Sequence, residues 1–309
     1  MKVTRVQNLS KDTFLTDFLV GNKPIIVTDA MKDFDRDKFT PDFLRSEFGE
    51  EQVQVYDDLF NLQTVDSLAT YLNKNFDRKP EDGRALEYMR WYTKLKDTDF
   101  FWSDEVFEKL KPYWKHPYFV PNDKLIVPYC EEGETKSITD HRYPYKGLFV
   151  SGRGSRTRLH RDPFRSNAML CQFYGEKKMY LYHPNKVNEV MNGKEFVDVM
   201  NVDHKKFPKF KDIEADYEDV LLPGEIILFP SGWFHDVTCV SDSISITWNF
   251  LHEEELDNLY QFIDRYPNDD QLEILRFFLK DKIDPAASAS EIKAFYESNR
   301  NNNFEFIDL

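Results

Sequence analysis

The sequence predicts an α+β protein with a mainly β core, because three stretches of different texture follow one another along its 309 residues. Residues 13–118 alternate helical and extended patterns, residues 124–251 carry many short β-branched and aromatic runs, and helical periodicity returns after residue 250. Short strands punctuated by Gly, Pro, Asn and Asp are typical of a β-sandwich or barrel. We therefore expect one core domain with appendages: an α/β region (1–120), a barrel (121–251) and a helical extension (252–309).

In the N-terminal region helix and strand signals alternate. TFLTDFLV (13–20), TPDFLRSEF (40–48) and VDSLATYLNKNF (65–76) have helical periodicity, whereas PIIVTDA (24–30) resembles a buried strand. The polar, turn-rich NFDRKPEDGR (75–84) is expected to form a surface loop.

The strands of the core are expected in seven runs, each bounded by turn residues. They are LIVPY, KGLFVS, NAMLCQFYG, KKMYLYHP, GEIILFP, HDVTCV and SISITWNFL. Three helical patterns follow, EEELDNLYQFIDRY, QLEILRFFLKDKI and SEIKAFYESN, with Pro267 and Pro285 between them.

Composition narrows the function class and the compartment. A formal net charge of −14 disfavours general capture of nucleic acid, since phosphate binding depends on clustered Lys and Arg. The three cysteines, Cys130, Cys171 and Cys239, fit neither a disulfide framework nor a CxxC zinc site, which favours a reducing compartment. The charged N-terminus lacks the apolar core of a signal peptide, and no apolar run approaches the roughly 18 residues of a membrane span. We expect a cytoplasmic protein that does not bind membranes.

A metal site is predicted from two separate segments. His160 and Asp162 lie two apart in LHRDPF, and residues i and i+2 of an extended strand project to the same face. His235 follows a strand and a Pro-Ser-Gly turn in LPGEIILFPSGWFHDV, and facing barrel strands would bring its imidazole to that pair. Two histidines and one carboxylate leave three open octahedral positions, as in Fe(II) oxygenases, whereas zinc hydrolases usually keep one. The alternative for His235 is packing within an aromatic cluster beside Trp233 and Phe234.

TRLHRDPFRSNAMLCQFYGEKKMYLYHP, LPGEIILFPSGWFHDV and SISITWNF together resemble the JmjC family, the cupin-like 2-oxoglutarate oxygenases of the small hydroxylase type. The resemblance implies a double-stranded β-helix, also called a jelly-roll or cupin barrel. It also implies an Fe(II)- and 2-oxoglutarate-dependent dioxygenase that uses O2 and releases succinate and CO2. The metal ligands would be His160, Asp162 and His235.

The resemblance further implies a set of residues that bind the cosubstrate. Lys177, after the hairpin Gly175, matches the family lysine that meets the far carboxylate of 2-oxoglutarate, and it shares strand parity with Met179 and Leu181. Its alternative is an exposed edge-strand lysine. Thr157 and Thr247 match positions of a helping hydroxyl, Asn249 matches an Asn near the metal, and Tyr88 resembles a tyrosine that reaches the cosubstrate from outside the barrel. Leu170 stands where some relatives carry Asn.

One face of the last strand is expected to be polar. It holds Ser243, Ser245, Thr247 and Asn249, while Ile244, Ile246, Trp248 and Phe250 share the other face. Such a polar face either enters the barrel as part of a site or is exposed to solvent.

The predicted substrate is a side chain of a protein, a peptide or a free amino acid. Arg153, Arg156, Arg158, Arg161 and Arg165 crowd the metal motif, and Arg158, Arg161 and Arg165 are the candidates for binding an anionic group of the substrate. The alternative is that these arginines pair with acidic residues of the chain itself. A tRNA substrate is disfavoured by the net charge.

Three alternatives stay open at this point. A catalytically silent cupin-like binding module has the same fold, and a lysine demethylase or a tRNA hydroxylase shares both fold and metal centre. The apolar positions of the C-terminal helices suggest either a homodimer or docking onto the barrel of the same chain. They are Leu256, Leu259, Phe262, Ile263, Leu272, Ile274, Leu275, Phe277 and Phe278.

Overall fold

The computed structural model describes residues 1–78, 87–92, 106, 109–110, 112–121, 123–127, 146–279 and 282–300. Cys130 and the second half of the predicted loop at 75–84 lie outside these residues. The side chains of Phe277 and Phe278, two of the apolar positions considered for a dimer, lie outside the description as well.

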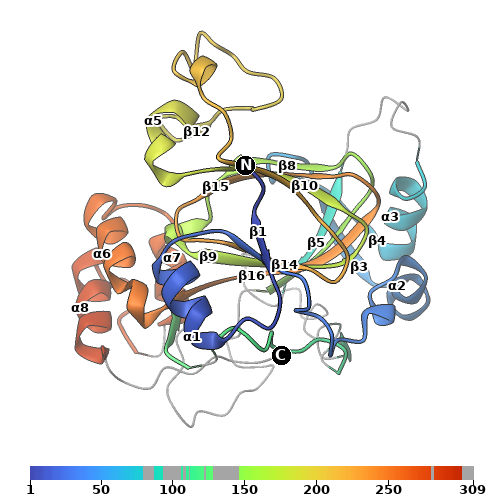
Figure 1. Cartoon of the computed structure of the whole chain (residues 1–309), viewed down its shortest axis with the longest axis horizontal. Coiled ribbons are helices and arrows are strands. Elements are labelled where there is room, and N and C mark those ends of the chain that lie inside the picture. The colour runs from blue at the N-terminus through green and yellow to red at the C-terminus, as the bar shows by residue number, and fades with distance from the viewer. Residues whose placement is uncertain are drawn as a thin grey trace.

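Two β-sheets, antiparallel except for the parallel pair β1 and β2, form the core, and they enclose the interior of a barrel (Figure 1). The smaller sheet has the order β13 (Tyr217–Leu221), β10 (Lys177–Tyr182), β15 (Phe234–Cys239), β8 (Arg156–His160). The larger sheet has the order β1 (Thr4–Val6), β2 (Ile25–Val27), β14 (Ile226–Phe229), β9 (Asn167–Tyr174), β16 (Ser243–His252), β7 (Lys146–Ser151), β5 (Tyr88–Tyr92), β3 (Gln52–Tyr56), β4 (Leu62–Ser67), and β6 (Leu125–Val127) also pairs with β16.

Consecutive strands β7 to β10 and β13 to β16 alternate between the two sheets, which is the double-stranded β-helix predicted from the sequence. The turn from β9 to β10 depends on Gly175, whose φ of +70° suits glycine and whose Cβ position lies 1.8 Å from the carbonyl oxygen of Asp242. Lys177 therefore begins β10 directly after a tight turn. Lys177, Met179 and Leu181 are all buried, as their shared parity predicts.

The alternation in β16 separates the interior of the barrel from the main hydrophobic core. Ile244, Ile246, Trp248 and Phe250 pack into the main core of the molecule, together with side chains of the N-terminal helices. The opposite face of the same strand carries Thr247 and Asn249 into the barrel. The polar face thus enters the barrel, and the solvent-exposed alternative is wrong.

The N-terminal region extends the larger sheet. Its helical elements are α1 (Lys11–Thr13), the π-helical η1 (Phe14–Val20), η2 (Arg36–Lys38), α2 (Pro41–Phe48) and α3 (Leu68–Asn75). The helix predicted over 65–76 begins only at Leu68, because Ser67 caps it by accepting from Thr70 N at 3.2 Å. Residues 65–67 instead end β4, which pairs with β3 beside the barrel. The predicted boundary near residue 120 stays a prediction.

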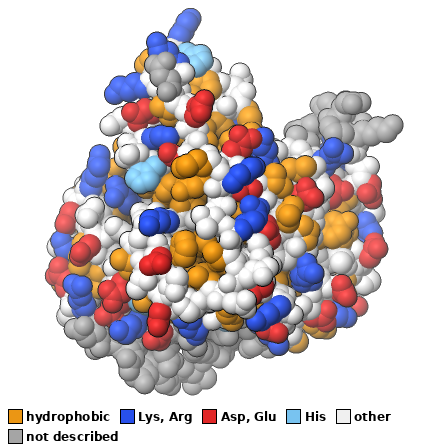
Figure 2. Space-filling view, in the orientation of Figure 1, with side chains coloured by type: hydrophobic (Ala, Val, Ile, Leu, Met, Phe, Trp, Pro, Cys, Tyr) orange, Lys and Arg blue, Asp and Glu red, His pale blue; other side chains and the backbone are white. Residues whose placement is uncertain are grey.

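A lobe made by residues 183–216 projects from the smaller sheet between β10 and β13, at the top of Figure 1. It contains η4 (Pro184–Lys186), α5 (Val187–Val190), β11 (Met191–Asn192), β12 (Glu195–Phe196) and η5 (Phe210–Asp212). A separate apolar cluster that includes Val190, Val197, Phe207 and Phe234 joins the lobe to the outer face of the smaller sheet. In Figure 2 basic side chains gather at its outer end, while both signs of charge are scattered over the rest of this face.

The C-terminal segment forms η6 (Glu253–Glu255), α6 (Leu256–Arg265), α7 (Leu272–Phe278) and α8 (Ala289–Asn299). The apolar residues of these helices pack on one another and on Ile126, Val127, Phe164 and Leu251 of the same chain. Leu256, Leu259, Phe262, Ile263, Leu272 and Leu275 are fully buried in this way. These side chains are therefore used within the chain, and homodimerisation through the helices stays a prediction.

Among the described residues, no helix combines the length and the apolar character that crossing a bilayer requires.

Candidate metal centre

Three predicted metal ligands meet at one end of the barrel. His160 ends β8 and pairs directly with His235 of β15, so the two strands are hydrogen-bonded neighbours and not the facing strands that we expected. Asp162 follows β8 in an extended conformation. One ligand atom from each of the three residues lies within 4.8 Å of the others, and His235 Nε2 is 3.7 Å from Asp162 Oδ2.

The backbone fixes both imidazoles with Nε2 as the metal-binding atom. His160 Nδ1 lies 2.9 Å from the carbonyl oxygen of Arg158, and His235 Nδ1 lies 3.4 Å from that of Trp233. A carbonyl oxygen only accepts, so each Nδ1 carries a proton and Nε2 is the nitrogen left for the metal. The His235 ring also stacks on Phe229 with centroids 4.3 Å apart. This is the orientation that metal-bound histidines adopt.

The electrostatics of the three groups suit a cation. Burial, then repulsion from His160, holds the pKa of His235 well below its ordinary value, so the ring is neutral and able to coordinate. Burial raises the pKa of Asp162, although His160 and Asn249 oppose the shift. A divalent ion would supply the positive charge that this buried carboxylate needs. The donor set therefore fits a hard or borderline divalent metal with open positions.

A β-bulge brings Thr157 and His160 to the same face. The register pairs His235 with His160 but Val237 with Thr157, so β8 holds one residue more than β15 over this interval. Without the bulge these residues, three apart, would point to opposite faces. Both line the same cavity in the structure.

Lys177 is a buried cation of the cavity at the barrel's centre and is only 5% exposed. Its Nζ donates to Ser245 Oγ at 2.6 Å and lies 5.7 Å from the centroid of Phe149. Among the residues that the structure describes, none places a carboxylate in an ion pair with it, and burial lowers its pKa. A buried ammonium without a counter-ion is costly, so the site suits a carboxylate from outside the chain.

A cavity of about 360 Å³ connects the metal ligands to Lys177. Its lining contains Thr157, Leu170, Lys177, Thr247 and Asn249 beside His160, Asp162 and His235. Such a volume is in the usual range for a small-molecule site. One cavity therefore offers a metal centre at one end and a buried cation at the other.

A family model described as a cupin-like domain matches residues 11–258. The chain belongs to the cupin-like domain family. The match spans the barrel and most of the N-terminal region, which confirms the resemblance stated from the sequence. In this cupin-like barrel the candidate metal ligands lie where β8, an edge strand of the smaller sheet, pairs with β15.

The names of curated relatives refer to demethylation, to 2-oxoglutarate- and iron-dependent oxygenation or to a JmjC domain. The chain is 26% identical over 277 residues to the arginine-specific demethylase JMJ20 of Arabidopsis thaliana, covering 83% of this chain and 58% of that protein. It is 32% identical over 155 residues to the 2-oxoglutarate and iron-dependent oxygenase JMJD4 of Danio rerio, covering 48% and 35%. JmjC domain-containing protein A of Dictyostelium discoideum matches with 23% identity over 78% of this chain and 92% of that protein. The chain thus spans only part of the length of the first two.

Tyr88 lies behind the cavity wall of the cupin-like barrel and is not among the lining residues. Its ring is buried and stacks on Phe149, with centroids 6.3 Å apart, and Phe149 lines the cavity. Arg90, two residues later on the same face of β5, reaches the lining instead and is 5% exposed. Its guanidinium lies 3.9 Å from the ring centroid of Tyr56. Direct contact of Tyr88 with the cosubstrate stays a prediction.

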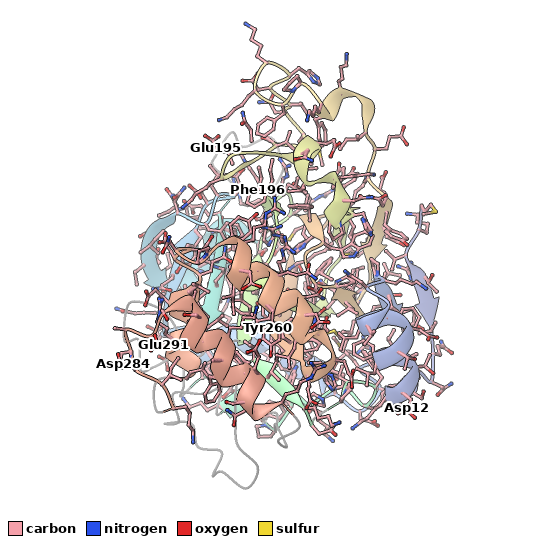
Figure 3. The ribbon with its side chains drawn as sticks, turned by 90° about the vertical axis from the view of Figure 1, so that its left-hand side faces the viewer. Asp12, Glu195, Phe196, Tyr260, Asp284 and Glu291 are labelled. Atoms are coloured by element: carbon pink, nitrogen blue, oxygen red, sulfur yellow. The ribbon has the colours of Figure 1, made fainter. Side chains whose placement is uncertain are left out.

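Sequence reasoning missed the aromatic residues at the cavity. Phe60 comes from the loop between β3 and β4, has a φ of 67°, and packs edge-on against the His160 ring with centroids 5.1 Å apart. Phe196 belongs to β12 of the lobe, and Figure 3 shows it there beside Glu195. Both lie on segments with no strand or helix signal. Arg90 is two residues after Tyr88 in β5, so strand alternation is the one sequence signal that could have indicated Arg90 as a cavity residue.

The five arginines around the metal motif differ in their surroundings. Arg156 donates to Asp236 and Asp198, and Arg158 donates to Asp58 at 2.6 Å, so these two pair with acidic residues of the chain. Arg158 thereby holds the loop that carries Phe60, and substrate binding by Arg158 stays a prediction. Arg161 lines the cavity, and burial followed by repulsion from Arg165 lowers its pKa. Arg153 is exposed at the surface.

A chain of hydrogen bonds leads from the candidate metal ligand Asp162 to the C-terminal helices. Asn249 bonds Asp162 and donates to the carbonyl oxygen of Asn167 at 3.4 Å. Asn167 in turn donates to Glu255 Oε2 at 2.6 Å. Burial raises the pKa of Glu255 to about 8, whereas burial lowers that of the nearby His252 to about 4.

The raised pKa of Glu255 predicts that the protein loses stability as the pH rises from 6.5 to about 8. In this range the unfolded chain has released the proton that native Glu255 still holds, so the free energy of unfolding falls by about 1 kcal/mol per pH unit. His252 acts in the opposite direction, but only between about pH 4 and 6.5. Urea unfolding across this range is expected to show the fall in wild type and a flat profile in Glu255→Gln. The assignment would be contradicted if the free energy of unfolding fell equally with pH in wild type and Glu255→Gln. It would also be contradicted if the substitution Glu50→Gln at the surface removed the fall.

Proposed function

We propose that the protein is an Fe(II)- and 2-oxoglutarate-dependent dioxygenase that hydroxylates a side chain of a polypeptide. One observation carries the proposal. The two histidines and the carboxylate of the candidate metal centre line the same cavity as Lys177, a buried lysine that suits a carboxylate from outside the chain. The relatives' names, 2-oxoglutarate and iron-dependent oxygenase among them, support it. A catalytically silent binding module would not require a metal centre and a buried lysine in one cavity.

When bound, iron(II) with 2-oxoglutarate supplies the oxidising chemistry, in which O2 is consumed, succinate and CO2 are formed and a substrate C–H bond is hydroxylated. The residues of the chain bind and orient the reactants. His160 and His235 would bind the ion through their Nε2 atoms, and Asp162 would contribute a carboxylate oxygen. A divalent ion held by these three protein ligands would keep further coordination positions open for the cosubstrate and O2.

Lys177 would neutralise the far carboxylate of 2-oxoglutarate. Ser245 holds its Nζ in place at 2.6 Å, and Thr157 of the smaller sheet and Thr247 of the larger sheet line the same cavity. Phe149 and Phe229 make the surroundings apolar, which strengthens the ion pair and limits the entry of water. Asn249, bonded to Asp162, would orient the carboxylate ligand.

A polypeptide substrate fits the mouth of the cavity better than a free amino acid. Phe60 is 36% exposed beside His160, and Phe196 of the lobe reaches the same cavity, so the rim is built from two segments outside the barrel. Leu59, Leu62 and Val65, close to Phe60 in the sequence, are also exposed apolar side chains. A nucleic acid is disfavoured by the net charge of −14.

Hydroxylation and demethylation differ in their products, and the name of JMJ20 makes demethylation the second candidate. Protein loaded with Fe(II) without oxygen should form succinate from 2-oxoglutarate once O2 is admitted. Mass spectrometry of modified peptides should show one added oxygen. The reaction mixture should contain no formaldehyde. Stoichiometric formaldehyde would establish a demethylase, and the absence of succinate together with the absence of metal binding would establish a silent module.

Cytoplasmic location and homodimerisation through the C-terminal helices are proposals of the same kind. The odd number of cysteines supports the first. The second is supported by the apolar side chains of the helices that stay only partly buried within the chain, among them Tyr260, Ile274 and Phe295. Cell fractionation tests the location. Sedimentation velocity tests the dimer, and a monomer at micromolar concentration would contradict it.

A further inference from the structure

The backbone directly after the metal motif is held in an unusual conformation. Phe164 and Arg165 both have left-handed φ values, 42° and 56°, which are costly for residues other than glycine. Phe164 N donates to Gln271 Oε1 at 2.6 Å, and the Arg165 carbonyl accepts from Ser231 Oγ at 2.7 Å. Phe164 is buried against the C-terminal helices. The turn thus fixes Arg165 between the metal centre and α6.

Arg165 lines an open groove along α6, the helix that bears the labelled Tyr260 in Figure 3. Gln261, Asp264 and Arg265 of that helix complete the groove. Arg161 adjoins it, because Arg161 interacts with both Arg165 and Arg265 and hydrogen-bonds Tyr266. Arg161 also lines the cavity of the metal centre. A continuous line of guanidinium groups therefore leads from the metal cavity to the groove.

These arginines differ from Arg156 and Arg158 in their partners. Among the residues that the structure describes, no acidic side chain forms an ion pair with Arg161, Arg165 or Arg265, although the chain has 55 acidic residues against 41 basic ones. Asp264, which shares the groove, pairs with Lys293 of α8 at 2.8 Å. Arg165 Nε is buried without a hydrogen-bond partner. Three neighbouring cations repel one another, so the cluster suits an anion from outside.

We propose that Arg161, Arg165 and Arg265 bind an acidic side chain of the polypeptide substrate, next to the residue that enters the metal cavity. The inference rests on the proposed function, because it assigns the substrate of the same site. A carboxylate matches the planar fork of arginine. Asp264 in the groove repels a phosphate group, which carries about −1.5 to −2 charge, more strongly than it repels a single carboxylate.

The test measures binding and does not depend on turnover. Protein loaded with Mn(II) and 2-oxoglutarate is titrated into three fluorescein-labelled peptide pools, in which a degenerate centre is flanked by glutamate, glutamine or phosphoserine. At low ionic strength, fluorescence anisotropy should show about tenfold tighter binding of the glutamate pool than of the glutamine pool. Succinate formation by wild-type protein without peptide reports separately on the proposed function.

The variants decide which side chains are responsible. Arg165→Gln and Arg265→Gln should each reduce the preference for glutamate several-fold, whereas Arg153→Gln, an equal change of charge in the same segment, should leave it unchanged. Arg265→Glu should weaken the glutamate pool further, and circular dichroism verifies that each variant is folded. No preference in wild type, or an equal loss in Arg153→Gln, would overturn the proposal. Tighter binding of the phosphoserine pool, lost in the same variants, would overturn the assignment to a carboxylate.

Discussion

His160→Ala is expected to abolish succinate formation and to lower Fe(II) affinity by more than the roughly 10- to 100-fold that loss of an outer-shell partner costs. His160 supplies one of three ligand atoms that converge within 4.8 Å, and the remaining pair leaves the ion only two protein ligands. Alanine also removes the ring that packs against Phe60 and His235. The measurement is titration of the apoprotein with Mn(II), followed by electron paramagnetic resonance.

The matched control is His204→Ala, because His204 is exposed on the lobe and far from the cavity lining. It should bind Mn(II) as wild type does. Unchanged metal affinity in His160→Ala would remove His160 from the ligand set and with it the proposed centre.

Lys177→Met is expected to have opposite effects on function and on stability. Binding of 2-oxoglutarate should weaken by about 100- to 1,000-fold, since the cosubstrate's far carboxylate would be buried without a charge partner. The free energy of unfolding of the protein without cosubstrate should rise by about 1–3 kcal/mol, because a buried ammonium is replaced by an apolar side chain of similar length. Isothermal titration and urea unfolding measure the two effects.

Lys178→Met serves as the control for Lys177, since Lys178 lies on the opposite face of β10 and pairs with Glu218 at 2.7 Å. Neither cosubstrate affinity nor stability should change by more than about 1 kcal/mol there. A Lys177→Met variant that is less stable than wild type and binds 2-oxoglutarate equally well would show that the lysine has a purely structural role.

Parts of the site governed by strand alternation could be predicted from the sequence. The shared parity of Lys177, Met179 and Leu181 indicated an inward lysine, and the alternating pattern of β16 separated the face with Thr247 from the face with Trp248. These inferences held because a period of two is a local property of an extended chain.

Features that depend on pairing between distant segments could not be predicted in the same way. The bulge in β8 that turns Thr157 toward the cavity exists only in its register with β15. Phe60 and Phe196 reach the cavity from a loop and a lobe whose positions depend on tertiary contacts, such as that of Arg158 with Asp58. The role of Arg158 in that contact became visible only once the fold was known.

The same limitation applies to the N-terminal region. Residues 62–67 were expected to lie partly in a helix, yet they form β4, because the cap at Ser67 and pairing with β3 outweigh the local helical periodicity. Arg265 joined the candidate substrate site only through the packing of α6 beside the metal motif, which no sequence spacing indicates.

The most direct test of the central claim, that one cavity holds both the metal and the cosubstrate, is calorimetric titration of 2-oxoglutarate into protein with and without Mn(II). The structure predicts one molecule bound per chain, with an affinity that depends on Mn(II) and is lost in Lys177→Met even though that variant still binds the metal. Binding of 2-oxoglutarate that is equally tight without metal, or unaffected by Lys177→Met, would contradict it.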